Sequence, residues 1–255
     1  MLLVIDIGNT NITMGVYKNN QLENVSRFKH GKDLIQNTVT TVFNSIYGNI
    51  HPRDCIISSV VDELTEIVQN AVYEVYKLKP FIVTSDYDIG VNLKVKNPET
   101  IGADRLANLC AAAKLYKKRP LIVVDSGSAT TFDIIDKDNN FIGGVIMPGL
   151  EMQFNALNQF TSKLPLITYE NFNKAHKIIC ANTKNEMTSG VIRGHICGIE
   201  GLLSLCQKEL DAKPFVILTG GDAGTIEKYM QKKFFNAVHP NLTLEGAAIL
   251  YELNV

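Results

Sequence analysis

An internal repeat is the feature that most restricts how this chain of 255 residues folds. The segment Asp6–Asn9 (Asp-Ile-Gly-Asn) follows an apolar run, and the segment Asp125–Ser128 (Asp-Ser-Gly-Ser) follows a second apolar run 119 residues later. At the same offset, the polar turn that begins at Lys18 is matched by a polar turn at Lys137. Chance easily gives one Asp-x-Gly pair, but it seldom also aligns a strand, a turn and a return strand. We therefore predict a duplicated fold.

Two similar domains account for the repeat and for the length of the chain. We place the first over residues 1–117 and the second over residues 118–255. The pattern restarts near Lys117–Pro120, and no linker rich in Pro, Gly or Ser separates the halves. Two like domains joined this tightly also predict a cleft that could enclose a ligand.

The hydrophobic pattern predicts that both domains are of the α/β class. Short apolar runs bounded by turn residues indicate buried strands, and apolar residues at helical spacing indicate helices. The predicted strands are Leu2–Asp6, Ile12–Tyr17, Leu22–Phe28, Cys55–Val60, Pro80–Thr84, Leu121–Asp125, Thr131–Asp136, Phe141–Ile146 and Phe215–Thr219. The predicted helices are Asp33–Tyr47, Asp62–Tyr76, Gly149–Ser162, Lys184–Glu209 and Leu242–Leu253, with one that opens near Gly102 and one that runs from Gly221 to about Lys233. Antiparallel hairpins followed by β-α-β units predict mixed sheets flanked by helices.

Composition excludes several classes of protein. The chain has 25 Lys+Arg against 26 Asp+Glu, so its formal net charge of −1 offers no electrostatic footprint for nucleic acid or anionic lipid. We therefore expect neither a nucleic-acid nor a membrane partner. The apolar run Met1–Ile5 is interrupted at once by Asp6, which indicates a buried strand rather than an export signal. We expect a cytoplasmic protein.

Cysteines and histidines give no sign of a zinc site or a nucleophilic centre. The five cysteines form no C-x-x-C pattern, and no two histidines are at ligand spacing. We expect each of the five histidines at the surface or hydrogen-bonded in the core.

The turn over Asp6–Asn11 has the residue types of a phosphate-binding loop. Gly8 allows a turn close to a ligand, and backbone N–H groups in such a turn can donate to phosphate oxygens. Asp6, at the end of the predicted strand, is placed to hold Mg²⁺ through water, because Mg²⁺ dehydrates reluctantly. An ordinary hairpin turn explains the same residue types. The recurrence at Asp125 favours the phosphate-binding interpretation.

The segment Gly102–Arg105 opens a predicted helix and allows two interpretations. An Asp in the first turn is favoured by the helix dipole, and Arg105 could be a surface ion-pair partner. Alternatively, Asp104 accepts the proton of a substrate hydroxyl while Arg105 binds a substrate carboxylate through its fork of N–H donors. The residues alone leave both open.

Seven segments of the chain resemble, in order, the motifs of type III pantothenate kinases, a family of the actin-like superfamily. The matching segments are Asp6–Thr10, Asn97–Arg105, Asp125–Asp133, Gly143–Gly149, Asn182–Thr183, Thr219–Gly221 and Leu242–Gly246. The resemblance implies a duplicated actin-like (ribonuclease H-like) fold. It also implies ATP-dependent phosphorylation of pantothenate to 4′-phosphopantothenate, the first step of coenzyme A biosynthesis.

The same resemblance implies a role for each matched residue. It makes Asp104 the catalytic base and Arg105 the clamp for the substrate carboxylate. Pantothenate would also contact Gly102, Ala103 and, from the neighbouring subunit of a homodimer, Thr183. The residues that would contact ATP are Asp6, Ile7, Gly8, Asn9, Thr10, Asn11 and Ser128. Asp125 would contribute to a site for a monovalent cation, K⁺ or NH₄⁺, near the phosphates.

Two other functions remain as alternatives. The first is a different actin-like phosphotransferase or phosphohydrolase, which would release phosphate without this acceptor. The second is a non-catalytic nucleotide-binding regulator, which predicts loss of Asp104 or Arg105 or an added basic patch. The sequence retains both residues and has no such patch.

Overall fold

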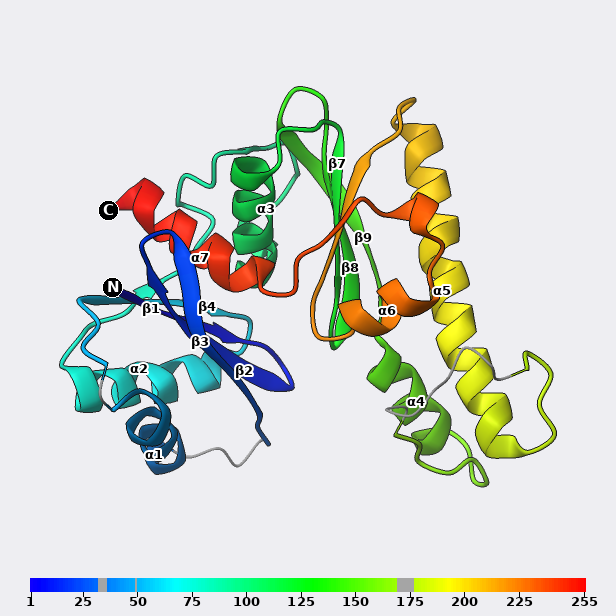
Figure 1. The fold of residues 1–255 in the computed structure, drawn as a ribbon, viewed down its shortest axis with the longest axis horizontal. Helices are drawn as coiled ribbons and strands as arrows, with labels where there is room; N and C mark the ends of the chain where they lie inside the picture. Colours follow the sequence, from blue (N-terminus) through cyan, green and yellow to red (C-terminus); the bar gives the residue numbers. More distant parts are fainter. Residues whose placement is uncertain (32–35, 49, 169–176) are drawn as a thin grey trace. The chain divides into compact units, whose positions relative to one another are not determined.

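The structure is a computed structural model that describes residues 1–31, 36–48, 50–168 and 177–255. It divides into two compact units (Figure 1). The first unit contains Met1–Lys117 together with Asn241–Val255, and the second contains Lys118–Pro240. The repeat predicted one domain over residues 118–255, whereas the structure groups the last helix with the first unit.

The first unit is built on a five-stranded sheet with the order β3-β2-β1-β4-β5. Its strands are β1 (Leu2–Ile7), β2 (Asn11–Lys18), β3 (Gln21–Lys29), β4 (Asp54–Ser59) and β5 (Phe81–Ile82). Strand β1 pairs antiparallel with β2 and parallel with β4, so the sheet is mixed as predicted. The two-residue strand β6 (Asn92–Leu93) and the short 3-10 helix η1 (Pro98–Thr100) follow and were not predicted.

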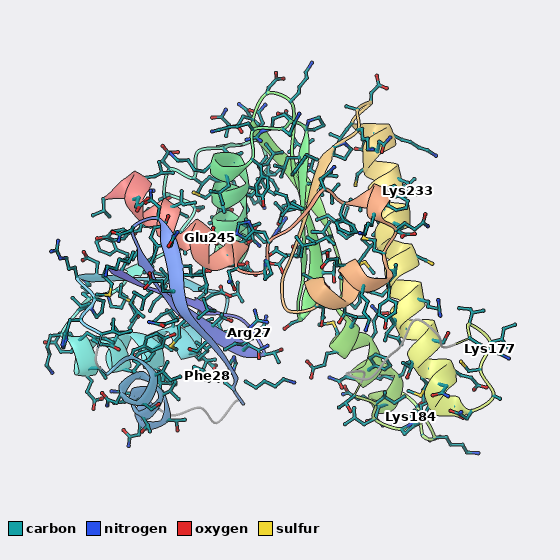
Figure 2. The ribbon with its side chains drawn as sticks, viewed as in Figure 1. Arg27, Phe28, Lys177, Lys184, Lys233 and Glu245 are labelled. Atoms are coloured by element: carbon teal, nitrogen blue, oxygen red, sulfur yellow. The ribbon has the colours of Figure 1, made fainter. Side chains whose placement is uncertain are left out.

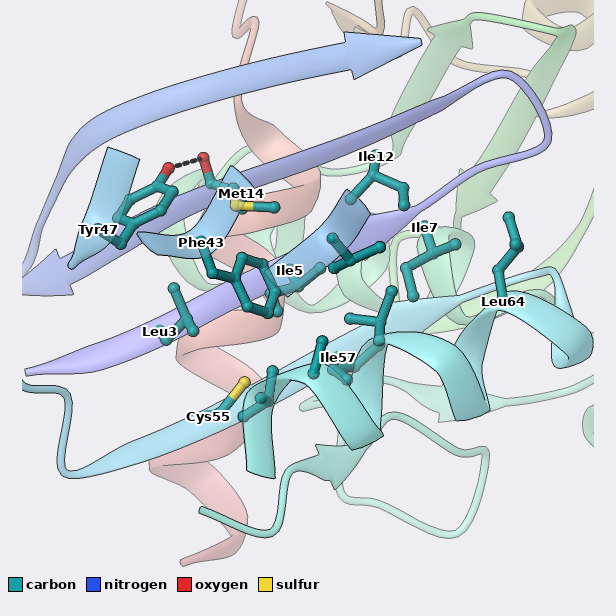
Figure 3. Close-up of a cluster of buried hydrophobic side chains, with 14 of the residues drawn as sticks. Leu3, Ile5, Ile7, Ile12, Met14, Phe43, Tyr47, Cys55, Ile57 and Leu64 are labelled. Carbon is teal, nitrogen blue, oxygen red and sulfur yellow. Dashed lines mark hydrogen bonds between the residues drawn. The ribbon is translucent and has the colours of Figure 1, made fainter. Parts of the chain in front are cut away.

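Helices α1 (Gln36–Tyr47) and α2 (Asp62–Tyr76) close one face of this sheet. Their apolar sides meet Leu3, Ile5 and other strand residues in a hydrophobic core (Figure 3). The Tyr47 hydroxyl at the edge of this core donates to the Met14 carbonyl at 3.0 Å. The start of the helix predicted over Asp33–Tyr47 lies partly outside the described residues.

Helices α3 (Ala103–Leu115) and α7 (Leu242–Asn254) pack against each other in the same unit, and α7 also contacts β1, β2 and β4. Both helices are rich in small buried residues, which lets their backbones come close. At the closest point, a Cβ on Gly246 would overlap the carbonyl of Ala107. This close packing explains why the last helix belongs to the first unit.

The second unit repeats the topology of the first. Its strands are β7 (Leu121–Ser126), β8 (Ala129–Ile135), β9 (Asn140–Pro148), β10 (Phe215–Thr219) and β11 (Ala237–Val238), and they lie in the order β11-β10-β7-β8-β9. Strand β7 pairs antiparallel with β8 and parallel with β10, as β1 does with β2 and β4. The predicted duplicated α/β fold is confirmed.

The helices of the second unit are α4 (Leu150–Gln159), α5 (Thr183–Glu209) and α6 (Ala223–Tyr229), with the 3-10 helix η2 (Lys232–Phe234). Helices α5 and α6 cover one face of its sheet. Helix α6 ends before the predicted Lys233, because Met230 is extended and buried and the Gln231 N–H donates to a Glu200 carboxylate oxygen at 2.7 Å. Among the described helices, none is both long enough and apolar enough to span a bilayer.

Candidate active site

The loop between β1 and β2 is held in shape by the first unit itself. The Gly8 N–H donates to the Asn11 carbonyl at 3.0 Å, which closes the turn. His30, just after β3, braces it twice: its Nε2 donates to the Gly8 carbonyl at 2.8 Å, and its backbone N–H donates to the Thr10 carbonyl at 3.1 Å. Sequence reasoning placed His30 at the surface or in the core and missed this contact with the loop.

The glycines of the two Asp-x-Gly turns are not required by the packing of the protein. A Cβ on Gly8 would meet its nearest neighbour, the Asn11 carbonyl oxygen, at an ordinary 3.5 Å, and a Cβ on Gly127 would meet no atom of the described residues within 4 Å. Neither residue has a positive φ angle. Because the chain itself accepts a side chain at both places, the glycines leave space that a ligand can approach. This is the behaviour expected of phosphate-binding turns.

Asp6 is fixed by the neighbouring strand β4. Ser58 lies opposite Asp6 in the parallel pairing, and its hydroxyl donates to Asp6 Oδ1 at 3.0 Å. The carboxylate is half-buried at the carboxyl end of β1, next to the Gly8 turn. An oriented carboxylate at the end of a strand, next to a glycine turn, has the chemistry to hold Mg²⁺ through water.

The start of helix α3 lies beside the carboxyl ends of β1 and β4. The Val60 N–H donates to the Ile7 carbonyl at 3.1 Å, and a Cβ on Gly102 would come within 3.2 Å of the Val60 side chain. The structure thus brings the Asp6–Asn11 loop and the Gly102–Arg105 segment together in one unit. The segment carries its acidic residue, Asp104, in the first turn of the helix, as predicted.

Asp104 is a carboxylate in a poorly solvated position. Gly102 makes room for it, because a Cβ there would collide with Asp104 Oδ1. That oxygen accepts the Arg105 backbone N–H at 2.7 Å. Burial raises the pKa of Asp104 above its usual value, and the Arg105 N–H and the Arg105 charge oppose only part of that rise. A raised pKa makes this carboxylate a better proton acceptor than an exposed one.

We expect this raised pKa to set the acid limb of the activity profile. Only ionised Asp104 can accept a proton, so kcat/KM for the acceptor should fall as the pH drops through its pKa in the free enzyme. Because burial moves that pKa upward, the limb should lie at higher pH than the titration of an ordinary Asp. The measurement is kcat/KM from pH 4 to 9 at constant ionic strength, with circular dichroism as the check on folding. A flat profile over the whole range in which the protein stays folded would contradict the assignment.

The second loop, Asp125–Ser128 at the turn from β7 to β8, begins with Asp125, which lies between two buried hydroxyl groups. Thr131 of β8 and Thr219 of β10 are its register partners, so all three side chains share one face of the sheet. The Thr131 and Thr219 hydroxyl oxygens are buried and have no hydrogen-bond partner among the residues that the structure describes. Gly220, at a φ of 91°, leaves space for the carboxylate, because a Cβ there would collide with Asp125 Oδ1. Buried hydroxyls without partners, next to a carboxylate, fit a cation bound through oxygen ligands.

Ser128 lies in a turn that a buried histidine supports. The turn is closed by the Gly127 N–H, which donates to the Ala129 carbonyl at 2.9 Å, and the Ser128 carbonyl accepts the Gly149 N–H at 3.1 Å. Next to this turn, in the buried part of the strands, the Thr130 hydroxyl lies 3.0 Å from the Ser126 hydroxyl and 3.2 Å from His195 Nε2.

His195 stays neutral at physiological pH. Burial lowers its pKa to about 4. Gln153 Nε2 donates to its Nδ1 at 2.8 Å, so Nε2 carries the proton and donates to Thr130. His195 is therefore a hydrogen-bonded core residue, as predicted, and it supports the second loop through its hydrogen bond to Thr130.

Thr183 belongs to neither loop. It is the first residue of α5, and its side chain is exposed. The helix is capped by Asn182, whose side chain accepts the Asn185 N–H at 3.0 Å, so the Thr183 hydroxyl is not used as a cap. Figure 2 labels the next residue, Lys184, at this exposed end of α5.

Comparison with known proteins identifies the family. A model of the type III pantothenate kinase family matches residues 2–205 of the chain. The chain belongs to the type III pantothenate kinase family. Members of this family phosphorylate pantothenate with ATP on the route to coenzyme A, and the type III pantothenate kinase match covers the Asp6–Asn11 loop, the Gly102–Arg105 segment, the second loop and Thr183.

Solved structures of three other proteins have the same fold at low identity. One, described as a Baf family transcriptional activator from Campylobacter jejuni, is 20% identical with a TM-score of 0.59, over 98% of this chain and 97% of that chain. The ethanolamine utilization protein EutJ from Carboxydothermus hydrogenoformans is 15% identical with a TM-score of 0.55, over 97% and 89%. The activator of 2-hydroxyisocaproyl-CoA dehydratase from Clostridium difficile, solved with bound ADPNP, is 12% identical with a TM-score of 0.54, over 99% and 95%. At these identities the likeness concerns the fold alone.

Proposed function

We propose that this type III pantothenate kinase uses Asp104 as the base that activates the 4′-hydroxyl of pantothenate. The observation that carries the proposal is the position of Asp104: it is a carboxylate with a raised pKa, in the first turn of a helix whose N-cap, Gly102, lies against Val60, and the Val60 N–H donates to the carbonyl of Ile7, the residue before Gly8. Arg105 and the backbone of Gly102 and Ala103 bind the rest of the acceptor, with the Arg105 guanidinium paired to the pantothenate carboxylate. Ser128 and the Asp6–Asn11 loop bind ATP.

In the proposed step, the 4′-oxygen of pantothenate forms a bond to the γ-phosphorus. The bond from that phosphorus to the β–γ bridging oxygen breaks, its electron pair stays on ADP, and the hydroxyl proton passes to Asp104. Phosphoryl transfer needs little covalent chemistry from the protein, so positioning and charge stabilisation account for most of the rate enhancement. Asp104 positions the acceptor hydroxyl, and N–H groups of the Asp6–Asn11 loop stabilise the charge on the phosphates.

Two cations complete the proposed site. Asp6, oriented by Ser58, holds Mg²⁺ through water, and Mg²⁺ when bound neutralises charge on the phosphates. Asp125, with the hydroxyls of Thr131 and Thr219, holds a monovalent cation, K⁺ or NH₄⁺. The two unpartnered buried hydroxyls support this site, because leaving such groups unsatisfied costs free energy.

We further propose that the protein is a homodimer in the cytoplasm, in which Thr183 reaches the pantothenate of the neighbouring subunit. Exposed apolar side chains support an interface here: Ile178 and Ile179, just before α5, are 64% and 84% exposed. Exposed apolar groups gathered beside a polar contact residue are typical of protein–protein interfaces.

One coupled assay tests the proposed function. ADP release is measured with pantothenate, acetate, a hexose or no acceptor, first in K⁺ and then in Na⁺. We expect turnover with pantothenate only, and faster turnover in K⁺ than in Na⁺. Phosphate release without an acceptor would favour the phosphohydrolase alternative instead, and nucleotide binding without any turnover would favour the regulator.

A further inference from the structure

Arg27 of β3 lies in one row with Asp6. In the antiparallel pairing, Arg27 is opposite Thr13, and Thr13 is opposite Asp6. Paired residues on neighbouring strands project from the same face of a sheet, so Arg27, Thr13 and Asp6 point to one side. The residues on either side of Arg27 point to the other: Phe28 packs on the core, and Ser26 hydrogen-bonds to the Tyr47 hydroxyl at 2.9 Å. Figure 2 labels Arg27 and Phe28 on this strand.

The Arg27 side chain is anchored in a direction that leads towards Asp6. Its Nε donates to Thr13 Oγ1 at 3.0 Å, which draws the guanidinium from β3 over β2. Neighbouring strands are about 4.8 Å apart, so a guanidinium above β2 is within one strand spacing of Asp6 on β1. Anchoring through Nε also leaves the two terminal nitrogens as a fork of N–H donors.

That fork has no carboxylate partner among the residues that the structure describes, and the residue is exposed. Such a fork matches two oxygens of a phosphate group, and holding it by Nε reduces the entropy lost when the ligand binds. A second cation, Lys29, lies on the same face opposite Asn11, the last residue of the loop.

The second unit gives an internal comparison. Its equivalent row runs from Ile146 of β9 through Thr131 and Asp125 to Thr219 of β10, whereas the first runs from Arg27 through Thr13 and Asp6 to Ser58. The carboxylate and the hydroxyls recur, but the position of Arg27 holds Ile146, which is 63% exposed. The duplicated fold therefore does not require a cationic side chain at this position. The first unit has one beside its Asp6–Asn11 loop, and the second unit has an isoleucine instead.

We propose that Arg27 binds the terminal phosphates of ATP at the Asp6–Asn11 loop and stabilises the charge that builds up as the γ-phosphoryl group transfers. This rests on the proposed function, which places ATP at that loop. Arg27 forms no covalent bond and exchanges no proton. It donates hydrogen bonds to phosphate oxygens while the bond to the β–γ bridging oxygen breaks and Asp104 receives the proton of the acceptor.

The test compares Arg27→Gln and Arg27→Lys with Lys18→Gln, which removes another exposed cation from the far end of the same hairpin. We expect Arg27→Gln to lower kcat by about 10²-fold, the usual effect of losing one group that stabilises transition-state charge. Arg27→Lys should be intermediate, because it keeps the charge and loses the fork, and Lys18→Gln should match the wild type.

Calorimetry with two nucleotides gives a readout that does not depend on turnover. Arg27→Gln should weaken binding of the non-hydrolysable ATP analogue AMP-PNP by about 10-fold or more and leave AMP binding unchanged. Equal losses for both nucleotides would mean a general structural effect and would overturn the proposal, as would wild-type kcat and AMP-PNP affinity in Arg27→Gln. If the wild type lacks activity towards pantothenate, the proposed function fails, yet the nucleotide comparison still decides the role of Arg27.

Discussion

Replacing Asp104 by Asn should lower kcat by about 10²–10⁴-fold without unfolding the protein, the usual scale for loss of a general base. The amide keeps the size of the side chain and can still accept the Arg105 N–H through its carbonyl oxygen. It cannot take a proton from the acceptor alcohol. The measurement is steady-state turnover with ATP and pantothenate, together with thermal unfolding of both proteins.

The matched control for this variant is Asp62→Asn. Asp62 also lies in the first turn of a helix, α2, where its charge interacts favourably with the helix dipole, and its side chain is exposed. Its replacement should cost under about 1 kcal/mol of stability and leave kcat unchanged. Near-wild-type turnover in Asp104→Asn would contradict the assignment of Asp104 as the base. It would favour the interpretation of Asp104 as an ordinary residue at the start of a helix.

Replacing Gly246 by Ala should destabilise the first unit by about 1–3 kcal/mol, the usual cost of overpacking. The added Cβ would overlap the carbonyl of Ala107. Helices α7 and α3 would therefore have to move apart at a point where their backbones now lie against each other. The Ala substitution favours the helix by up to about 1 kcal/mol, which offsets part of the loss. The measurement is the denaturant midpoint and the temperature of unfolding.

Gly201→Ala is the control, since Gly201 lies inside α5 and is exposed, and no atom in the described part of the chain lies within 4 Å of a Cβ placed on it. The same chemical change there should leave stability unchanged or raise it by up to about 1 kcal/mol. If both variants unfold at the same denaturant concentration as the wild type, the close packing of α3 and α7 does not contribute to stability as we infer.

Local patterns predicted most of the fold because its strands are short apolar runs between turn residues. Helix Asp62–Tyr76 and strand Phe215–Thr219 were predicted with the bounds that the structure gives. The two-residue strands β6 and β11 were missed, whereas β5, which is equally short, was predicted because it lies inside the apolar run Phe81–Val83. The packing of α7 in the first unit was also missed, because no local feature of its sequence says which unit it joins.

The candidate site was predictable where chemistry is concentrated in a short motif, and not where it depends on strand register. The Gly102–Arg105 segment stands out as a motif, and the structure adds its place beside the first loop. Arg27 and His30 carry no such signal in the sequence. Their positions relative to Asp6 and Gly8 depend on the register between β3 and β2. A shift of one residue in that register would turn the Arg27 side chain to the other face of the sheet.

The place of α7 also affects how the chain folds during synthesis. Residues 118–240 form one continuous unit, so they can fold as soon as they have left the ribosome. The first unit lacks one of its helices until residues 241–255 emerge, about 7–30 s after residue 117 at 5–20 residues per second. During that interval the side of α3 that later packs on α7 is uncovered. The half of the molecule that is made first is thus the last to be completed.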